Sequence, residues 1–340
     1  MDLILSLLST EFLGKSVGAW LLFLGVIAVL LAFDLGVLHR KQREVGFRES
    51  LWLSAGYVAV ALAFGAWLWW TMGQTAGMAY FTGYFIEKSL SLDNVFVIAL
   101  IFGYFAVPRS LQHRVLFWGV LGAIALRGIM ILLGAVLVSR FGWVLYLFGA
   151  FLLVTGVQML LAKERRPDLA DNAVIRFVRR HLNVTSDLHR ESFFVRLPDP
   201  AEPGRTALFA TPLFLALMLV EAVDLIFAVD SVPAIFAITT DPYIVYTSNI
   251  FAILGLRSLY FALAFMIHRF RYLKQALALV LIFIGVKIFW THLVGEVHPG
   301  LSLGVTLALL VGGVLASLWR TREERDLRPD AEAHSAPVGC

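Results

Sequence analysis

The chain has 340 residues, of which 59% are hydrophobic and 15% are charged, and its mean hydropathy is +0.81. Because about a quarter of the residues in a soluble domain are charged, this composition excludes a soluble globular protein. The formal charge of +4 is explained below by orientation in a membrane and does not indicate a nucleic-acid partner. The one cysteine, Cys340, excludes an intramolecular disulfide and a cysteine-based metal centre.

Apolar runs close to the ~20 residues that cross a bilayer recur along the chain. They predict an all-α, polytopic membrane helical bundle with about nine transmembrane helices, at residues 17–38, 50–71, 78–107, 115–139, 141–162, 208–240, 244–267, 275–292 and 301–319. The boundary at 139–142 is the least distinct, because its two flanking runs are nearly continuous. The chain then divides into spans 1–5 (1–162), a cytoplasmic amphipathic loop (163–206), spans 6–9 (207–319) and a disordered cytoplasmic tail (320–340).

The basic residues predict how these spans are oriented. Segments 39–49, 108–114, 163–206, 268–274 and 320–340 hold 22 of the 28 Lys and Arg residues, and the opposite segments hold only Lys15 and Arg140. Cytoplasmic loops carry an excess of Lys and Arg. We therefore expect the amino terminus outside and the carboxyl terminus inside.

Two segments of the cytoplasmic loop have distinct patterns. Residues 174–182, VIRFVRRHL, form an amphipathic pattern with Arg176, Arg179 and Arg180 on the polar side. This pattern is typical of a helix lying on the anionic inner leaflet, and the alternative is a regulatory or partner-binding segment. Residues 197–205 predict a flexible connector, and the charged segment from Arg322 predicts disorder.

The sixth span carries three carboxylates, Glu221, Asp224 and Asp230, followed by Pro233. An ionised carboxylate at the centre of a bilayer costs at least ~2.5 kcal/mol, so such groups face a bundle interior or an aqueous cavity and mark the path of an ion or substrate. Pro233 removes a backbone donor and frees the carbonyl of Val229. This either breaks the helix and adds carbonyl ligands or produces a harmless kink.

Spans 3–5 resemble spans 6–8. Aligning Asp93-Asn94-Val95 with Asp230-Ser231-Val232 also aligns Glu87 with Asp224, and ALRGIM around Arg127 then matches GLRSLY around Arg257. TGVQML around Gln158 matches IGVKIF around Lys287 in the same order. Because each copy has three spans, the two copies cross the membrane in opposite senses. We therefore predict an inverted three-plus-three repeat with a site near the midplane between the halves.

The spans hold six acids and four bases. The bases could pair with some of the acids and so fix helix packing, but two acids would remain, and a bound cation could supply the missing charge. The acids are Asp34, Glu87, Asp93, Glu221, Asp224 and Asp230, and the charge-compensating bases are Lys88, Arg127, Arg257 and Lys287.

The candidate ligands are hard oxygen donors. The amide of Asn94 and the hydroxyl of Ser231 accompany the carboxylates, and no His or Cys lies deep in a span. Such a set suits Mn²⁺, Ca²⁺ and Mg²⁺, which the residue types do not distinguish, and protons are a further candidate as cargo or counter-cargo. Residues six apart on a helix point about 120° apart, so Glu87 and Asp93 do not share a face, whereas Glu221 and Asp224 do.

Several long motifs resemble the TerC/Alx family of integral membrane proteins. They are EKSLSLDNVF, FGAFLLVTGVQMLLAKE, ATPLFLALMLVEAVDLIFAVDSVPAIFAITTDP and TSNIFAILGLRSLYF, and the resemblance covers about residues 32–318. It implies a LysE-like transporter linked to manganese export and tellurium resistance. It also implies a metal path through Asp34, Glu87, Asp93, Asn94, Glu221, Asp224, Asp230 and Ser231.

These observations together predict a multi-pass transporter of a bacterial-type inner membrane. We expect it to export a divalent cation, with manganese(II) as transported substrate, in exchange for protons, without a tightly bound cofactor and without catalytic residues. The sequence contains no Walker motif for an ATP-driven pump. Its partners would be the lipid bilayer and the cation; protein partners stay open.

Two alternatives remain. One is a membrane anchor or assembly factor in tellurium resistance or in the metallation of secreted proteins. The other, an intramembrane aspartic protease, has no support beyond the paired acids, so we expect no enzyme.

Overall fold

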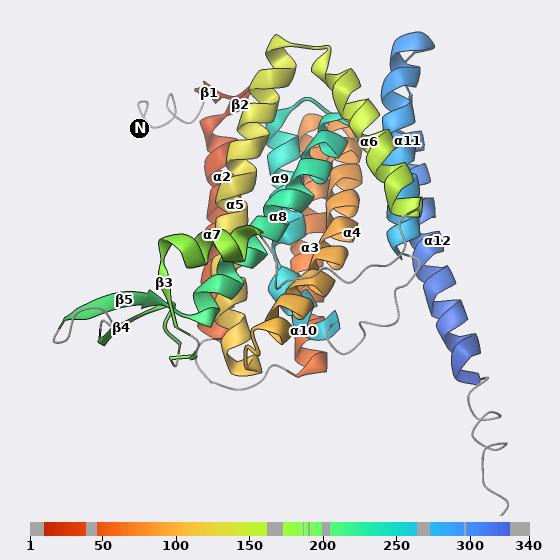
Figure 1. The fold of residues 1–340 in the computed structure, drawn as a ribbon. Coiled ribbons are helices and arrows are strands. Elements are labelled where there is room, and N and C mark those ends of the chain that lie inside the picture. Colours follow the sequence, from red (N-terminus) through yellow and green to blue (C-terminus); the bar gives the residue numbers. More distant parts are fainter. Residues whose placement is uncertain are drawn as a thin grey trace, which may run out of the picture.

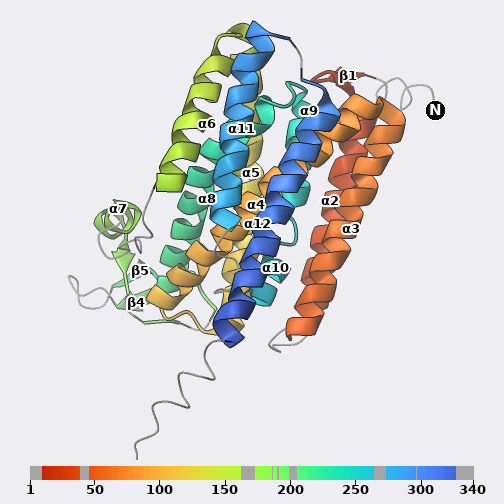
Figure 2. The same ribbon diagram turned by 90° about the vertical axis from the view of Figure 1, so that its right-hand side faces the viewer.

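Long helices lie side by side in a bundle, with a small sheet beside one end (Figures 1 and 2). The structure is a computed structural model and describes residues 10–38, 46–161, 173–185, 187–189, 191–198, 205–263, 273–295 and 297–326. The long helices are α2 (Val17–Leu38), α3 (Phe47–Met72), α4 (Gln74–Tyr104), α5 (Arg109–Arg140), α6 (Val144–Leu161), α8 (Pro212–Phe236), α9 (Pro242–Ile253), α10 (Leu256–Leu263), α11 (Leu273–Leu293) and α12 (Pro299–Asp326).

These helices confirm a polytopic helical membrane protein. Eight segments of the described residues are long and apolar enough to cross a bilayer, with α9 and most of α10 forming one of them. The 31-residue α4 has the length of a ninth span and carries the charged residues Glu87, Lys88 and Asp93 near its middle. All nine predicted spans therefore correspond to helices, and the indistinct boundary at 139–142 is the short turn between α5 and α6.

The packing of the helices supports the predicted repeat, which stays a prediction together with the orientation in the membrane. Helix α4 packs along α9 and α5 packs along α8, so exchanging the two halves maps one pair onto the other. The α6–α11 seam is reciprocal in detail. A Cβ on Gly156 would lie 2.8 Å from the carbonyl oxygen of Ala278, and one on Gly285 would lie 2.9 Å from that of Gly149. The repeat alignment pairs these same residues, Gly156 with Gly285 and Gly149 with Ala278.

The seventh span is broken, and the sixth is not. Helix α8 continues past Pro233 to Phe236. The proline lies in the last turn of the helix, and the amide of Ala237 donates to the carbonyl of Pro233 at 3.0 Å. In the seventh span, α9 ends at Ile253 and α10 begins at Leu256. Gly255 has a φ of +79°, a left-handed conformation that glycine adopts most readily. The irregular backbone therefore lies in span 7 rather than at Pro233.

The loop predicted to be cytoplasmic contains more structure than the sequence predicts. Helix α7 (Ala173–His181) is followed by the strands β3 (Asn183–Val184), β4 (Phe194–Pro198) and β5 (Thr206–Ala210), which form a sheet in the order β3-β5-β4. We call the described residues from α7 to β5 the cytoplasmic module, after the predicted orientation.

The module corrects two predicted boundaries. Residues 197–198, expected in a flexible connector, belong to β4, and residues 208–210, expected in span 6, belong to β5. Helix α8 starts only at Pro212, after Thr211. A proline in the first turn suits a helix start because its missing N–H needs no partner there.

The module packs on the bundle. In α7, Ile175 and Val178 are buried while Arg176 and Phe177 are exposed, and the helix packs against α8. Arg114 on α5 forms an ion pair with Glu191 at 3.0 Å. The buried face of the amphipathic helix therefore packs on protein, and contact of its exposed face with the inner leaflet stays a prediction.

The two ends of the chain also differ from expectation. Residues Glu11–Phe12 (β1) and Lys15–Ser16 (β2) form an unpredicted hairpin before α2. Helix α12 continues to Asp326, so residues 320–326 of the predicted disordered tail are helical. Residues 327–340 lie outside the described part of the chain.

The break in span 7 can be tested at Gly255. A Cβ there would lie 2.9 Å from three side-chain atoms of Tyr57, and the left-handed backbone adds strain for any L-residue. We expect Gly255→Ala to destabilise the purified protein by about 1–3 kcal/mol, measured as a lower melting temperature in detergent. Gly56→Ala on α3 is the matched control, since a Cβ there meets nothing within 4 Å. Equal melting temperatures for the two variants would contradict the analysis.

Candidate cation site

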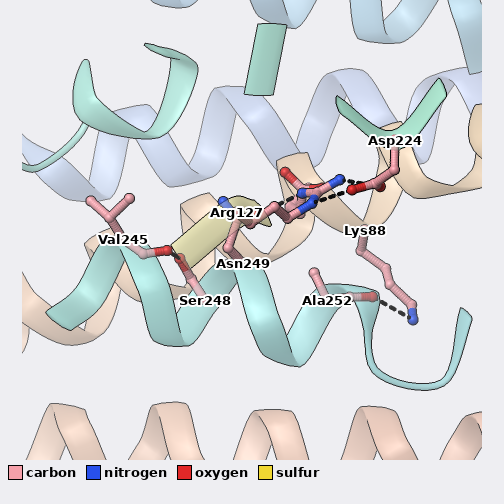
Figure 3. Close-up of polar contacts among 8 residues, drawn as sticks. Lys88, Arg127, Asp224, Val245, Ser248, Asn249 and Ala252 are labelled. Atoms are coloured by element: carbon pink, nitrogen blue, oxygen red, sulfur yellow. Dashed lines mark hydrogen bonds and ion pairs between the residues drawn. The ribbon is translucent and has the colours of Figure 1, made fainter. Parts of the chain in front are cut away.

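A fully buried arginine, Arg127 on α5, joins the two halves of the bundle (Figure 3). Its Nε and Nη2 donate to the two carboxylate oxygens of Asp224 on α8, at 3.1 and 2.7 Å. Its Nη1 donates to Glu87 on α4 and, at 2.6 Å, to the side-chain oxygen of Asn249 on α9. Glu87 and Asp224, the acids that the repeat alignment pairs, thus converge on one guanidinium.

The carboxylates are not balanced by this arginine. With both acids ionised, two carboxylates and one guanidinium carry a formal charge of −1, in a place where Glu87 and Arg127 are 0% exposed. The described residues provide no second basic partner for either acid. Because a buried charge without a partner costs several kcal/mol, an additional positive charge here would be stabilising.

Three buried side-chain oxygens near the cluster have no partner with good hydrogen-bond geometry among the described residues. They are Oε2 of Glu87, Oδ1 of Asn94 and Oγ of Ser231, and the Ser231 hydroxyl lies close enough to Glu87 to be a weak donor to it. Buried polar atoms are nearly always paired, so unpaired ones indicate a strained, wet or ligand-binding place. All three are hard oxygen donors of the type predicted for the site.

A small cavity lies beside the cluster, between the two halves. It has a volume of about 20 Å³ and is lined by Asn94 of α4 and Asp224 of α8, together with apolar residues that include Ile253 and Leu256 on either side of the span-7 break. A cavity of this size holds about one water molecule. A single small cation fits the same space.

Among the described residues, the other predicted acids do not bind Arg127. Asp34 forms an ion pair with Arg257 at 2.5 Å. Glu221 packs on Gly122 of α5 and has a buried Oε2 without a donor. Asp230 is half-buried and takes part in none of the recorded ion pairs of the described residues. Asp93 lies in α4, and its side chain is outside the described part of the structure.

No group of three or more His, Cys, Asp or Glu side chains among the described residues could hold a metal ion. Among the described side chains, the predicted ligands therefore do not form one shell. Glu87 and Asp224 bind Arg127, Ser231 lies beside Glu87 and Asn94 lines the cavity with Asp224, whereas Asp34 belongs to a separate ion pair.

Two of the four predicted charge-compensating bases have no acid partner among the described residues. The Nζ of Lys88 donates to the backbone carbonyl of Ala252 at 3.1 Å. The Nζ of Lys287 lies 3.3 Å from the hydroxyl of Ser302, in an outer cavity of about 740 Å³ between the ends of several helices. The outer cavity opens at the end of the bundle that the basic residues predict to be outside. Of the four bases, Arg127 and Arg257 form ion pairs with acids among the described residues.

Asn249 is the site residue that the sequence analysis does not identify. It accepts from Arg127 and is fully buried, as are its neighbours Thr247 and Ser248. The sequence feature that indicates it is the polar triplet 247–249 inside an apolar span, a pattern that ordinary helix packing also produces.

The fold and the cluster define a multi-pass membrane protein with a buried charged centre, and comparison with known proteins places it in a family. A profile of the integral membrane protein TerC family matches residues 72–325, so the chain belongs to the TerC family. No solved structure matches it.

The relatives are similar over most of their length. An uncharacterised membrane protein of Myxococcus xanthus is 47% identical over 316 residues, which cover 93% of this chain and 97% of the relative. Alx of Escherichia coli K12, named as a proposed membrane-bound redox modulator, is 47% identical over 309 residues, covering 88% and 94%. An uncharacterised membrane protein of Rickettsia bellii is 45% identical over 302 residues, covering 89% and 97%.

The role of Arg127 can be tested by its removal. Replacing one partner of a buried charge cluster typically costs 3–5 kcal/mol, because the remaining charges are left without compensation. We expect Arg127→Met to lower the melting temperature strongly, and adding Glu87→Gln and Asp224→Asn to restore part of the loss. Arg140→Met, at the exposed end of α5, should change little. An Arg127→Met protein as stable as Arg140→Met would show that the cluster does not hold the bundle together.

Proposed function

We propose that this protein exports a divalent cation, manganese(II), across the bacterial inner membrane in exchange for protons. The cation would bind between α4, α5, α8 and α9. The observation that carries the proposal is the convergence of Glu87 and Asp224, one acid from each half, on a single arginine. This arrangement leaves one buried negative charge beside a cavity of about 20 Å³.

The unpaired oxygens supply the expected ligands. Asn94 and Asp224 line the cavity, and the free oxygens of Glu87 and Ser231 lie in the adjacent cluster. Oxygen-only donor sets suit Mn²⁺, Mg²⁺ and Ca²⁺. Among these, manganese is the cation to which the resemblance to the TerC/Alx family points.

Arg127 would serve as an internal counter-charge during the cycle. Both oxygens of Asp224 accept from Arg127, and each keeps a second lone pair, so an arriving cation would either share this carboxylate with the guanidinium or displace it. The guanidinium has a second set of acceptors in Glu87 and Asn249 and so need not lose all its partners when it releases Asp224.

Charge balance favours protons as the counter-ion. Loading one dication changes the charge of the site by +2, and so does protonating both carboxylates. An exchange of one dication for two protons would therefore move no net charge across the membrane, and a membrane potential, worth about 2.3 kcal/mol per charge at 100 mV, would not oppose it.

Proteoliposomes that contain the purified protein test this function. We expect them to accumulate Mn²⁺ when a proton gradient is imposed, with Mg²⁺, Ca²⁺ and Zn²⁺ competing less effectively. Asp224→Asn and Glu87→Gln should each reduce transport roughly 10–100-fold, the range found when groups around a metal are removed. Asp187→Asn, an exposed acid of the cytoplasmic module, is the control. Native rates in both site variants would refute the assignment.

One observation favours the alternative of a membrane anchor. The cytoplasmic module exposes apolar side chains, with Phe177 at 63% and Leu208 at 58% exposure, which a partner protein could cover. If cells that lack the module lose function while Asp224→Asn cells retain it, the protein acts as an anchor rather than as a transporter.

A further inference from the structure

Lys88 is a basic residue near the middle of α4 that has no carboxylate partner among the described residues. Its neighbour in sequence, Glu87, binds Arg127 instead. Figure 3 shows the Lys88 side chain pointing away from Arg127, toward the loop that follows Ala252. Among the described residues, the ammonium donates to the backbone carbonyl of Ala252, at 3.1 Å. Placing a lysine inside a transmembrane helix costs free energy, and such residues mark functional sites. The group that the ammonium contacts therefore indicates what the site does.

Ala252 lies in the last turn of α9, where the helix is interrupted. The backbone ladder ends with the amide of Leu254 donating to the carbonyl of Ile250 at 2.9 Å. On the far side of the break, the amide of Leu259 donates to the carbonyl of Gly255 at 2.9 Å. The last four carbonyls of a helix have no intrahelical donor. The carbonyl of Ala252 is one of these and needs a donor or a cation from elsewhere.

The end of α9 also carries a partial negative charge. Aligned peptide dipoles place about −0.5 of an elementary charge at the carboxyl end of a helix. Ala252 and Ile253 are both buried, at 0% and 1% exposure, so little water is present to screen this charge. A monovalent cation is therefore stabilised here, and broken helices in membrane transporters use such ends to bind free ions.

The equivalent position in the other half carries no charge. The repeat alignment pairs Lys88 with Leu225, which is 39% exposed on the outside of α8. The other half thus has an ordinary apolar residue at this place. The charge at Lys88 is specific to the half that faces the broken helix.

We propose that the carboxyl end of α9 forms a monovalent-cation site and that the ammonium of Lys88 occupies it as a built-in ion. The native protein would then need no free alkali or ammonium ion at this place. Removal of the side chain would expose the site and make the protein dependent on an added cation. The site adjoins the cavity of the divalent-cation site at Ile253 but uses a different acceptor, the carbonyl of Ala252, and only the transport measurement below depends on the proposed export function.

Chemical rescue tests the proposal with the full-length protein. Lys88→Ala leaves the site empty, and Lys88→Met fills it with an uncharged side chain of similar length. In N-methyl-D-glucamine chloride, whose cation is too large for the site, we expect both variants to melt several degrees below the native protein. Equal ionic strengths of methylammonium chloride or sodium chloride should restore at least half of this loss in Lys88→Ala and none in Lys88→Met.

Lys287→Ala is the matched control, because Lys287 also lacks an acid partner among the described residues but contacts a hydroxyl rather than a helix end. Its melting temperature should not respond to the choice of cation. Equal rescue of Lys287→Ala and Lys88→Ala would mean a general salt effect and would overturn the proposal. A Lys88→Ala protein whose melting temperature in N-methyl-D-glucamine chloride equals that of the native protein would also overturn the proposal. If Lys88→Ala aggregates in all three salts while Lys88→Met is recovered, the place needs volume rather than charge, and the proposal fails.

Manganese transport provides a second readout. Proteoliposomes with native protein should transport equally in all three salts, whereas those with Lys88→Ala should require sodium or methylammonium. Cation-independent transport by Lys88→Ala would contradict the proposal. If native protein transports no manganese, the export function fails, and the melting data still decide whether Lys88 replaces a free cation.

Discussion

The central helices depend on the hydrogen bonds of one guanidinium. Arg127 extends from α5 and donates to acceptors on α4, α8 and α9 (Figure 3), so four helices from both halves meet at one side chain. Arginine suits this role because its planar fork binds a carboxylate with two parallel bonds and keeps its charge when buried. The two ends of such a fork cannot be satisfied unless all four helices keep their depth and rotation. The charged centre therefore specifies how the halves meet as well as what could bind between them.

The positions of the spans were predictable from the sequence, because apolar length alone defines a helix that crosses a bilayer. Apolar length gives the wrong helix boundary where apolar residues continue beyond the end of a helix. Leu208 was assigned to span 6, although the helix begins only at Pro212 and the preceding residues pair with β4. It also missed the break in span 7, because Gly255 lies in the apolar run 250–256 and only its left-handed backbone distinguishes it. A short sheet such as β3-β5-β4 leaves little periodic signal in so few residues.

The candidate site was predictable in its acids and not in their partners. The repeat alignment pairs Glu87 with Asp224, and in the structure both acids bind Arg127, as expected if the two halves form the predicted inverted repeat. Which base meets which acid depends on helix rotation, which neither spacing nor composition determines. Lys88 consequently binds a carbonyl and Lys287 a hydroxyl in the outer cavity, although both were expected to neutralise acids. Asn249 was missed because a polar residue in an apolar span has many roles in helix packing.

The glycine contacts between α6 and α11 limit how the halves can move. At Gly156 and Gly285 no side chain separates one backbone from the other, and each glycine rests on a carbonyl group of the opposite helix. Sliding one helix along the other would bring larger side chains into these two places and force the backbones apart. Pivoting about the line of contact keeps both glycines where they are. Any alternation of access between the two sides of the membrane would therefore rotate the halves about the α6–α11 contact. The displacement of each other helix would then increase with its distance from this contact.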